Sequence, residues 1–266
     1  MKSSTLICSA LVAASCGLSV LAFSANANAA SLTPVDLELS FLVDVSGSVD
    51  NNEFNLQKQG YVDAFNDGSL YTDFISKGAL GKIAVNLIYW SSAGEQIESV
   101  GWTLIDSVSA SQNFANAVAA STRQFDGLTA PGSAIAFATP RFFNNDFDGT
   151  RLVMDVSGDG QENDGLNTAT ARNNAIAAGI DAINGLVIGG DPSVLNFYEN
   201  EVKGGTNAFV SQVNDFTGFG SVIRDKIEIE VGQPQDVPEP ASVLGLLAFS
   251  ALGAGSTLKR KQEQKA

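Results

Sequence analysis

The sequence contains no histidine, and its two cysteines, Cys8 and Cys16, both lie within the first 29 residues. Without histidine, a Ser/His/Asp triad, a Cys/His dyad, a zinc-binding HExxH helix and a His-rich metal site are all excluded. Basic residues are also scarce, since 15 Lys and Arg stand against 29 Asp and Glu. The resulting net charge of −14 argues against nucleic acid as a partner. Any chemistry must therefore use carboxylates, hydroxyls or a bound ion.

Residues 1–29 have the pattern of a secretory signal peptide. Met1 and Lys2 precede an apolar run from Leu6 to Phe23, and the segment ends in small residues that offer two A-x-A cleavage registers. An uncleaved anchor helix is the alternative. Because both cysteines lie inside this segment, the mature chain is expected to contain no disulfide.

Residues 233–266 combine a short linker, a proline-rich turn, an apolar stretch and a basic tail. Val237-Pro238-Glu239-Pro240 is followed by the uncharged residues 241–258 and then by Lys259-Arg260-Lys261. A helix of this length spans about 27 Å, near the lower limit for crossing a bilayer. The basic residues are expected to stay cytoplasmic, which would place the main domain on the far side of the inner membrane.

This order of elements resembles the PEP-CTERM sorting signal of Gram-negative bacteria that make exopolysaccharide. The resemblance implies transient anchoring in the inner membrane, cleavage by an exosortase near Pro238-Glu239-Pro240, and release to the cell surface or matrix. A plain tail anchor is the alternative. Without both ends, residues 30–258 hold 28 acidic and 10 basic residues, a net charge of −18. Such a surface repels acidic polysaccharide unless divalent cations bridge the two.

Residues 31–232 are expected to form one domain in which strands alternate with helices. The apolar patterns predict strands at 37–45, 83–90, 96–105, 152–156 and 182–188. The predicted helices are one after a capping box of Asp50 and Glu53, then 109–123, one opened by Pro131, 167–178 ending at Gly179, and 216–227. This alternation predicts a doubly wound, Rossmann-like α/β fold with a mostly parallel sheet and helices on both faces. Such folds bind ligands at the carboxyl ends of their strands.

The first predicted strand ends in Asp44-Val45-Ser46-Gly47-Ser48, which places one carboxylate and two hydroxyls in a single tight loop. Hard oxygen donors of this kind suit Mg²⁺, although the same residues also favour an Asx or Ser turn leading into a helix. Thr129 precedes the Pro131 helix, and Asp159 follows the strand that begins at Leu152. A third hydroxyl and a second carboxylate are therefore expected at the same edge of the sheet.

At this point the chain resembles a von Willebrand factor A domain with its metal-ion-dependent adhesion site. In that family a DxSxS loop, a Thr from a second loop and an Asp from a third ligate one ion. The resemblance implies one divalent cation, Mg²⁺ with Mn²⁺ or Ca²⁺ as alternatives, held by Asp44, Ser46, Ser48, Thr129 and Asp159. The departures from the pattern are Leu128, where a second Gly is common, and Pro131 just after the Thr.

Four segments are more specific than the metal motif: DVSGSVD, WTLID, DVSGDG and GGTNAFV. With them, about residues 35–230 resemble a bacterial A-type family of unknown function.

The predicted donor set favours a binding role. Mg²⁺ takes about six oxygens, so three hydroxyls and two carboxylates leave at least one position for a ligand. Because two carboxylates only neutralise the ion, the metal can still take an acidic group from a protein or a polysaccharide uronate. The sequence therefore predicts a non-enzymatic adhesion module. The alternatives are a structural matrix protein with a purely stabilising ion and, less favoured without histidine, a metal-assisted hydrolase or phosphotransferase.

Some residues near these motifs have two interpretations. Asp155 either supports a ligand hydroxyl or bonds to loop amides. Glu162 and Asp164 form either a second cation site or an acidic solvated loop. Trp90 and Trp102 are predicted to be core residues rather than a platform for sugars.

Overall fold

The structure is a computed structural model that describes residues 31–232. The predicted signal peptide (1–29) and the predicted sorting signal with its membrane helix (241–258) lie outside the described residues. Among residues 31–232, no helix combines the length and the apolar character needed to cross a membrane.

A mostly parallel sheet forms the centre of the domain, as predicted. Its strand order is β4-β3-β2-β6-β7-β8, and β9 also pairs with β7. The pairs β2–β3, β2–β6, β6–β7 and β7–β9 are parallel, whereas β4 and β8 run antiparallel to their neighbours. The strands of this sheet are β2 (Glu38–Asp44), β3 (Ile83–Trp90), β4 (Gln96–Ile105), β6 (Leu152–Gly158), β7 (Ala182–Ile188), β8 (Gly204–Gly205) and β9 (Val210–Val213). Two short strands, β1 (Thr33–Val35) and β5 (Phe147–Gly149), form a separate parallel pair.

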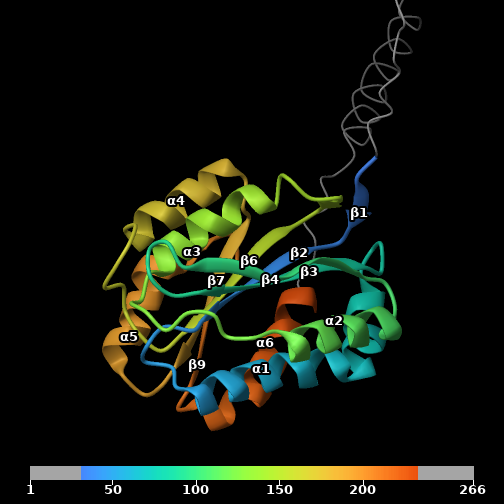
Figure 1. Ribbon diagram of the computed structural model, residues 1–266. Coiled ribbons are helices and arrows are strands. Elements are labelled where there is room, and N and C mark those ends of the chain that lie inside the picture. Colours follow the sequence, from blue (N-terminus) through green and yellow to red (C-terminus); the bar gives the residue numbers. More distant parts are fainter. Residues whose placement is uncertain (1–30, 233–266) are drawn as a thin grey trace, which may run out of the picture. The chain divides into compact units, whose positions relative to one another are not determined.

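Helices cover both faces of the sheet (Figure 1). The α-helices are α1 (Asn51–Asn66), α2 (Val108–Ala120), α3 (Pro131–Ala138), α4 (Thr168–Ala178), α5 (Pro192–Phe197) and α6 (Phe219–Gly232). The shorter helical turns are η1 (Leu70–Phe74), η2 (Ile75–Lys77), η3 (Thr139–Arg141), η4 (Tyr198–Val202) and η5 (Phe216–Gly218). In Figure 1, α1, α2 and α6 lie below the sheet, while α3 and α4 lie above it. The fold is therefore the doubly wound α/β class that the sequence predicts.

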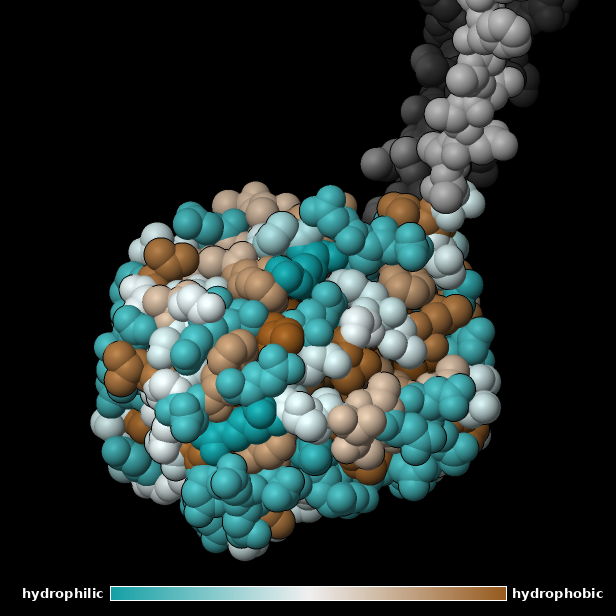
Figure 2. Space-filling view, in the orientation of Figure 1, coloured by the Kyte–Doolittle hydropathy of each residue, from teal (hydrophilic) through white to brown (hydrophobic). Residues whose placement is uncertain are grey.

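Each face of the sheet has its own hydrophobic core. The core under α1, α2 and α6 contains Phe41, Tyr61, Phe65 and Phe219, whose rings contact one another at centroid distances from 5.1 to 5.8 Å. The core under α3, α4 and α5 is built mainly of aliphatic side chains with Trp90 and Tyr198. Every residue of β2 and β3 is buried, as expected of parallel strands covered on both sides. On the outer surface in Figure 2, hydrophobic residues are scattered among hydrophilic ones.

Local capping explains where the first helix begins and where α4 ends. The Asp50 carboxylate accepts hydrogen bonds from the backbone N–H groups of Asn52 and Glu53, and the Glu53 carboxylate accepts one from the Asp50 N–H at 2.8 Å. This reciprocal pair confirms the predicted capping box. Gly179 ends α4 with a φ of 116°, a conformation that favours glycine.

Two predicted helices differ from the structure. The helix predicted at 109–123 ends at Ala120, because the Ser121 hydroxyl donates to the Val118 carbonyl at 2.6 Å and the chain then becomes extended. The helix predicted at 216–227 is a 3₁₀ turn, Phe216–Gly218, followed by α6 up to Gly232. The short strands β1, β5, β8 and β9 were not predicted, because none exceeds four residues.

A fully buried group of charges joins α6 to the sheet. The Lys226 ammonium lies 2.7 Å from the Asp155 carboxylate on β6 and 2.5 Å from the Glu230 carboxylate on α6. The Asn184 side chain on β7 also donates to Glu230, at 2.7 Å. Both interpretations of Asp155 were therefore wrong, because its partner is a lysine that lies 71 positions further along the chain. Burial raises the pKa of Asp155, and burial together with the charge of Asp155 raises the pKa of Glu230 to about 7, with Lys226 acting against both shifts.

We predict that Lys226→Met strongly destabilises the domain. The substitution leaves two carboxylates buried without their cation, which typically costs about 3–5 kcal/mol of the free energy of unfolding. Urea denaturation measures this loss. Lys203→Met is the matched control, because Lys203 pairs with Glu199 at the surface and such pairs contribute about 0–1 kcal/mol. Equal losses in the two variants would contradict the prediction.

Candidate metal centre

Parallel pairing of β2 with β6 places two carboxylates at the same edge of the sheet. Asp44 is the last residue of β2, Asp159 directly follows β6, and Val43 lies opposite Ser157 in the register. The chain order also reverses at β2, since β3 lies on one side of it and β6 on the other. This is the position at which doubly wound sheets form ligand sites.

The structure brings all five predicted residues together. The Ser46 N–H donates to Asp44 Oδ1 at 2.8 Å, and the Ser46 and Ser48 hydroxyl oxygens are 3.3 Å apart. The Ser48 hydroxyl donates to Asp159 Oδ1 at 2.6 Å. The Thr129 hydroxyl donates to Ser46 Oγ at 3.4 Å. Three loops that are distant in sequence therefore contribute to one cluster of hard oxygen atoms, the candidate metal centre.

The candidate metal centre has a buried side and an open side. Asp44 and Ser46 have no exposed surface, and Thr129 is only 5% exposed. Ser48 is exposed and Asp159 is half-buried. An ion in the cluster would contact the buried residues on one side and would remain accessible to solvent on the other.

Arg123 holds the loop that carries Ser46. Its Nη2 donates to the carbonyls of Val45 and Ser46 at 3.0 and 2.9 Å, and its Nε donates to the Phe125 carbonyl at 2.9 Å. Arg123 was not among the predicted site residues. A lone arginine after an apolar helix gives no signal for the loop that it contacts 77 positions away.

Gly47 allows the same loop to approach the segment before Thr129. Its N–H donates to the Gly127 carbonyl at 2.7 Å, and a Cβ atom at this position would lie 2.8 Å from the Asp126 carbonyl oxygen. Only glycine fits so close an approach. The glycine between the two serines is therefore required by packing.

The Thr129 loop is fixed from two sides despite its unusual neighbours. Its N–H donates to Asn163 Oδ1 at 2.8 Å, and the Asn163 N–H donates back to the Thr129 carbonyl at 3.0 Å. The Leu128 N–H donates to Ser92 Oγ at 2.8 Å. Pro131 occupies the first position of α3, where no N–H is needed. Neither Leu128 nor Pro131 displaces Thr129 from the cluster.

Glu162 and Asp164 hold the loop between Asp159 and α4. The Glu162 carboxylate accepts from the N–H and the hydroxyl of Thr168 at 2.5 and 2.6 Å, and Asp164 accepts from the Ala93 N–H at 2.8 Å. Both side chains are half-buried. These contacts give both carboxylates a role in holding the loop, and within residues 31–232 no group of three or more acidic, His or Cys side chains is arranged to hold a metal. The candidate metal centre differs from such groups because three of its five donors are hydroxyls.

The two carboxylates of the candidate metal centre are electrostatically strained. Burial, and secondly the charge of Asp159, raise the pKa of Asp44 to about 7, while the hydrogen bond from Ser46 and the nearby backbone N–H of Asp159 act against the shift. Burial also raises the pKa of Asp159, against the hydrogen bond from Ser48. Within the described part of the chain, neither carboxylate forms an ion pair with Lys or Arg. A divalent cation is the partner that would relieve both.

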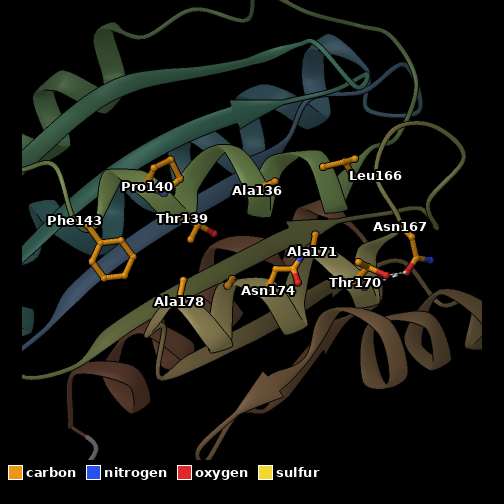
Figure 3. A pocket seen from close by; sticks show the side chains of 11 residues that line it. Ala136, Thr139, Pro140, Phe143, Leu166, Asn167, Thr170, Ala171, Asn174 and Ala178 are labelled. Carbon is orange, nitrogen blue, oxygen red and sulfur yellow. Dashed lines mark hydrogen bonds between the residues drawn. The ribbon is translucent and has the colours of Figure 1, made fainter.

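An apolar cavity of about 490 Å³ lies between α3 and α4 (Figure 3). Phe143 and Leu166 line its two ends, and Ala136 and Ala178 lie between them on the two helices. None of the five residues of the candidate metal centre lines it, so the cavity is a separate feature. The tryptophans do not form a platform either. Trp90 is fully buried as predicted, and the half-buried Trp102 packs on Phe142 with ring centroids 5.1 Å apart.

The fold is similar to that of von Willebrand factor A-type structures. The chain belongs to the family described as "Protein of unknown function (DUF1194)", which matches residues 34–235. The comparison with curated proteins finds no match.

Solved structures share the fold at low sequence identity. Proximal thread matrix protein 1 from the mussel byssus superimposes with a TM-score of 0.55 and 17% identity, over 77% of this chain and 48% of that chain. A second structure of that protein, "with zinc occupied MIDAS motif", gives a TM-score of 0.54 and 15% identity over the same shares, 77% and 48%. A von Willebrand factor type A structure from Catenulispora acidiphila gives 0.52 and 16%, over 75% of this chain and 44% of that chain. The chain thus spans about half the length of these proteins.

We predict that the stability of the metal-free protein falls as the pH rises. The folded state holds the Asp44 proton up to about pH 7, whereas the ordinary value is 3.8. The contribution of this group to the free energy of unfolding is therefore complete below about pH 4 and is lost as the pH rises through about 7. Urea denaturation in EDTA between pH 4 and 8 measures the slope.

Asp44→Asn, which does not titrate, is expected to show a shallower fall over the same range. The exposed Asp106→Asn is the control and is expected to keep the wild-type slope. Equal slopes for Asp44→Asn and the wild type would contradict the assignment.

Proposed function

We propose that this protein is an exported binding module that holds one divalent cation in the candidate metal centre and binds an acidic group of a partner through that cation. The observation that carries the proposal is the convergence of five hard oxygen side chains from three loops on one edge of the sheet. The proposed ligands are Asp44, Ser46, Ser48, Thr129 and Asp159.

The donor set fits a small hard cation. Hydroxyl and carboxylate oxygens suit Mg²⁺, with Mn²⁺ and Ca²⁺ as alternatives. Asp44 and Asp159 supply two carboxylates, neither of which forms an ion pair with Lys or Arg among residues 31–232, and this favours a doubly charged ion. The cluster is open to solvent on the side of Ser48, which is exposed, and Asp159, which is half-buried. There a carboxylate of a protein or polysaccharide would complete the coordination shell of the cation.

The proposal assigns no catalytic activity to the protein. The chain contains no histidine, and both carboxylates of the candidate metal centre serve as ligands. The exported location is supported by the signal-peptide pattern of residues 1–29 and by the likeness of residues 233–266 to a PEP-CTERM sorting signal. We propose transient anchoring in the inner membrane of a Gram-negative bacterium, processing by an exosortase, and final placement at the cell surface or in the matrix. The fold shared with a mussel matrix protein is consistent with such a setting.

Calorimetric titration of Mg²⁺, Mn²⁺ and Ca²⁺ into the purified protein tests the cation. We expect one saturable site in the wild type and its loss in Asp44→Ala and in Asp159→Ala, because each substitution removes a charged ligand. Asp106→Ala removes an exposed carboxylate elsewhere and is expected to keep the site. Absence of saturable binding at millimolar metal in the wild type would refute the proposal.

A second experiment separates adhesion from a purely structural ion. A soluble polyuronate and a Glu-rich peptide are tested for binding in Mg²⁺ and in EDTA. We expect binding of at least one probe in Mg²⁺ and its loss in EDTA and in Asp44→Ala, with the fold intact by circular dichroism. If EDTA lowers the melting temperature without changing probe binding, the ion is structural and the adhesion hypothesis is wrong.

A further inference from the structure

Tyr198 is a buried tyrosine whose hydroxyl has no hydrogen-bond partner among residues 31–232. The side chain has no exposed surface and lies in the π-helical turn η4, which follows α5. Gly185 on β7 makes room for its ring, since a Cβ there would lie 2.8 Å from Tyr198 Cδ1. A buried polar group without a partner requires an explanation, because its desolvation is not compensated.

The other fully buried tyrosines differ from Tyr198 in this respect. The Tyr61 hydroxyl pairs with Ser157 Oγ at 3.4 Å, and the Tyr89 hydroxyl pairs with Ser121 Oγ at 2.7 Å. If the role of Tyr198 were only to fill the core, phenylalanine would fill it without burying a hydroxyl. The hydroxyl therefore points to a specific contact.

Asp44 Oδ2 is the nearby atom that also lacks a partner. It is fully buried and accepts no hydrogen bond from residues 31–232, while Oδ1 of the same carboxylate accepts the Ser46 N–H. A Cβ atom on Gly158 would lie 2.6 Å from Tyr198 Oη and 2.7 Å from Asp44 Oδ2. Both oxygens thus face the same small space beside Gly158, at the end of β6 and next to Asp159.

The two groups are chemically complementary. Burial raises the pKa of Tyr198 well above its ordinary value of 10.0, and the charges of Asp44, Asp159 and Asp155 act in the same direction. The phenol therefore keeps its proton and is available as a hydrogen-bond donor. A carboxylate oxygen accepts more than one contact, so Asp44 can take this hydrogen bond and still bind a cation.

We propose that Tyr198 is a positioning residue for the metal centre, whose hydroxyl donates across one water to Asp44 Oδ2 and fixes the orientation of that carboxylate. This inference rests on the proposed function. The main-chain N–H of Ser46 holds one oxygen of Asp44, and Tyr198 holds the other. A carboxylate whose two oxygens are both held loses less conformational entropy when the cation binds. Groups that hydrogen-bond to metal ligands usually raise the affinity for the metal in this way.

The test is calorimetric titration of Mg²⁺ into the purified protein and its Tyr198→Phe variant. The substitution removes only the hydroxyl oxygen, and we expect the affinity for Mg²⁺ to fall about 10-fold or more. Tyr89→Phe is the matched control, because it removes a buried hydroxyl that pairs with Ser121 away from the candidate metal centre. It is expected to keep the wild-type affinity within about a factor of two.

Urea denaturation in EDTA distinguishes a role of Tyr198 in metal binding from a role in stabilising the fold. We expect Tyr198→Phe to lower the metal-free stability no more than Tyr89→Phe does, since each substitution removes one buried hydroxyl. If Tyr198→Phe binds Mg²⁺ like the wild type, or if its weaker binding is accompanied by a larger loss of metal-free stability than in Tyr89→Phe, the inference is overturned while the proposed function stands. If the wild type itself binds no metal, both are overturned.

Discussion

The parallel pairing of β2 with β6 is the constraint on which the rest of the candidate metal centre depends. It brings Asp44 and Asp159 to one edge of the sheet, where the DxSxS loop and the Thr129 loop meet them. Further contacts keep these loops in place. Arg123 and Gly47 hold the first loop against the segment before Thr129, and Asn163 ties Thr129 to the loop after Asp159.

The core cluster and the candidate metal centre each bring two carboxylates together, but the two pairs differ in what surrounds them. In the core, Asp155 and Glu230 share Lys226, a cation that the chain itself supplies. At the edge of the sheet, Asp44 and Asp159 have hydroxyl neighbours and no basic partner within the described residues. The first arrangement is complete and joins α6 to the sheet. Under the proposed function, a cation from solution would complete the second, and this physical difference distinguishes a structural charge cluster from a candidate binding site.

Much of the fold was predictable because its signals are local. The continuous apolar runs of β2 and β3, the capping box of Asp50 and Glu53, and the stop at Gly179 all act within a few residues. One error lies beside a tertiary contact that has no local signal. The helix predicted to reach residue 123 ends at Ala120, and the extended chain then lets Arg123 reach the Ser46 loop.

The sequence by itself determined the class of the fold and which hydroxyls and carboxylates reach the carboxyl edge of the sheet. Those features follow from periodicity and from the position of each motif at the end of a strand. Only the tertiary structure decided that Lys226 neutralises Asp155, that Arg123 holds the Ser46 loop, and that Tyr198 faces Asp44 beside Gly158. These contacts join side chains from elements far apart in sequence, and no local spacing encodes which of them the packing brings together.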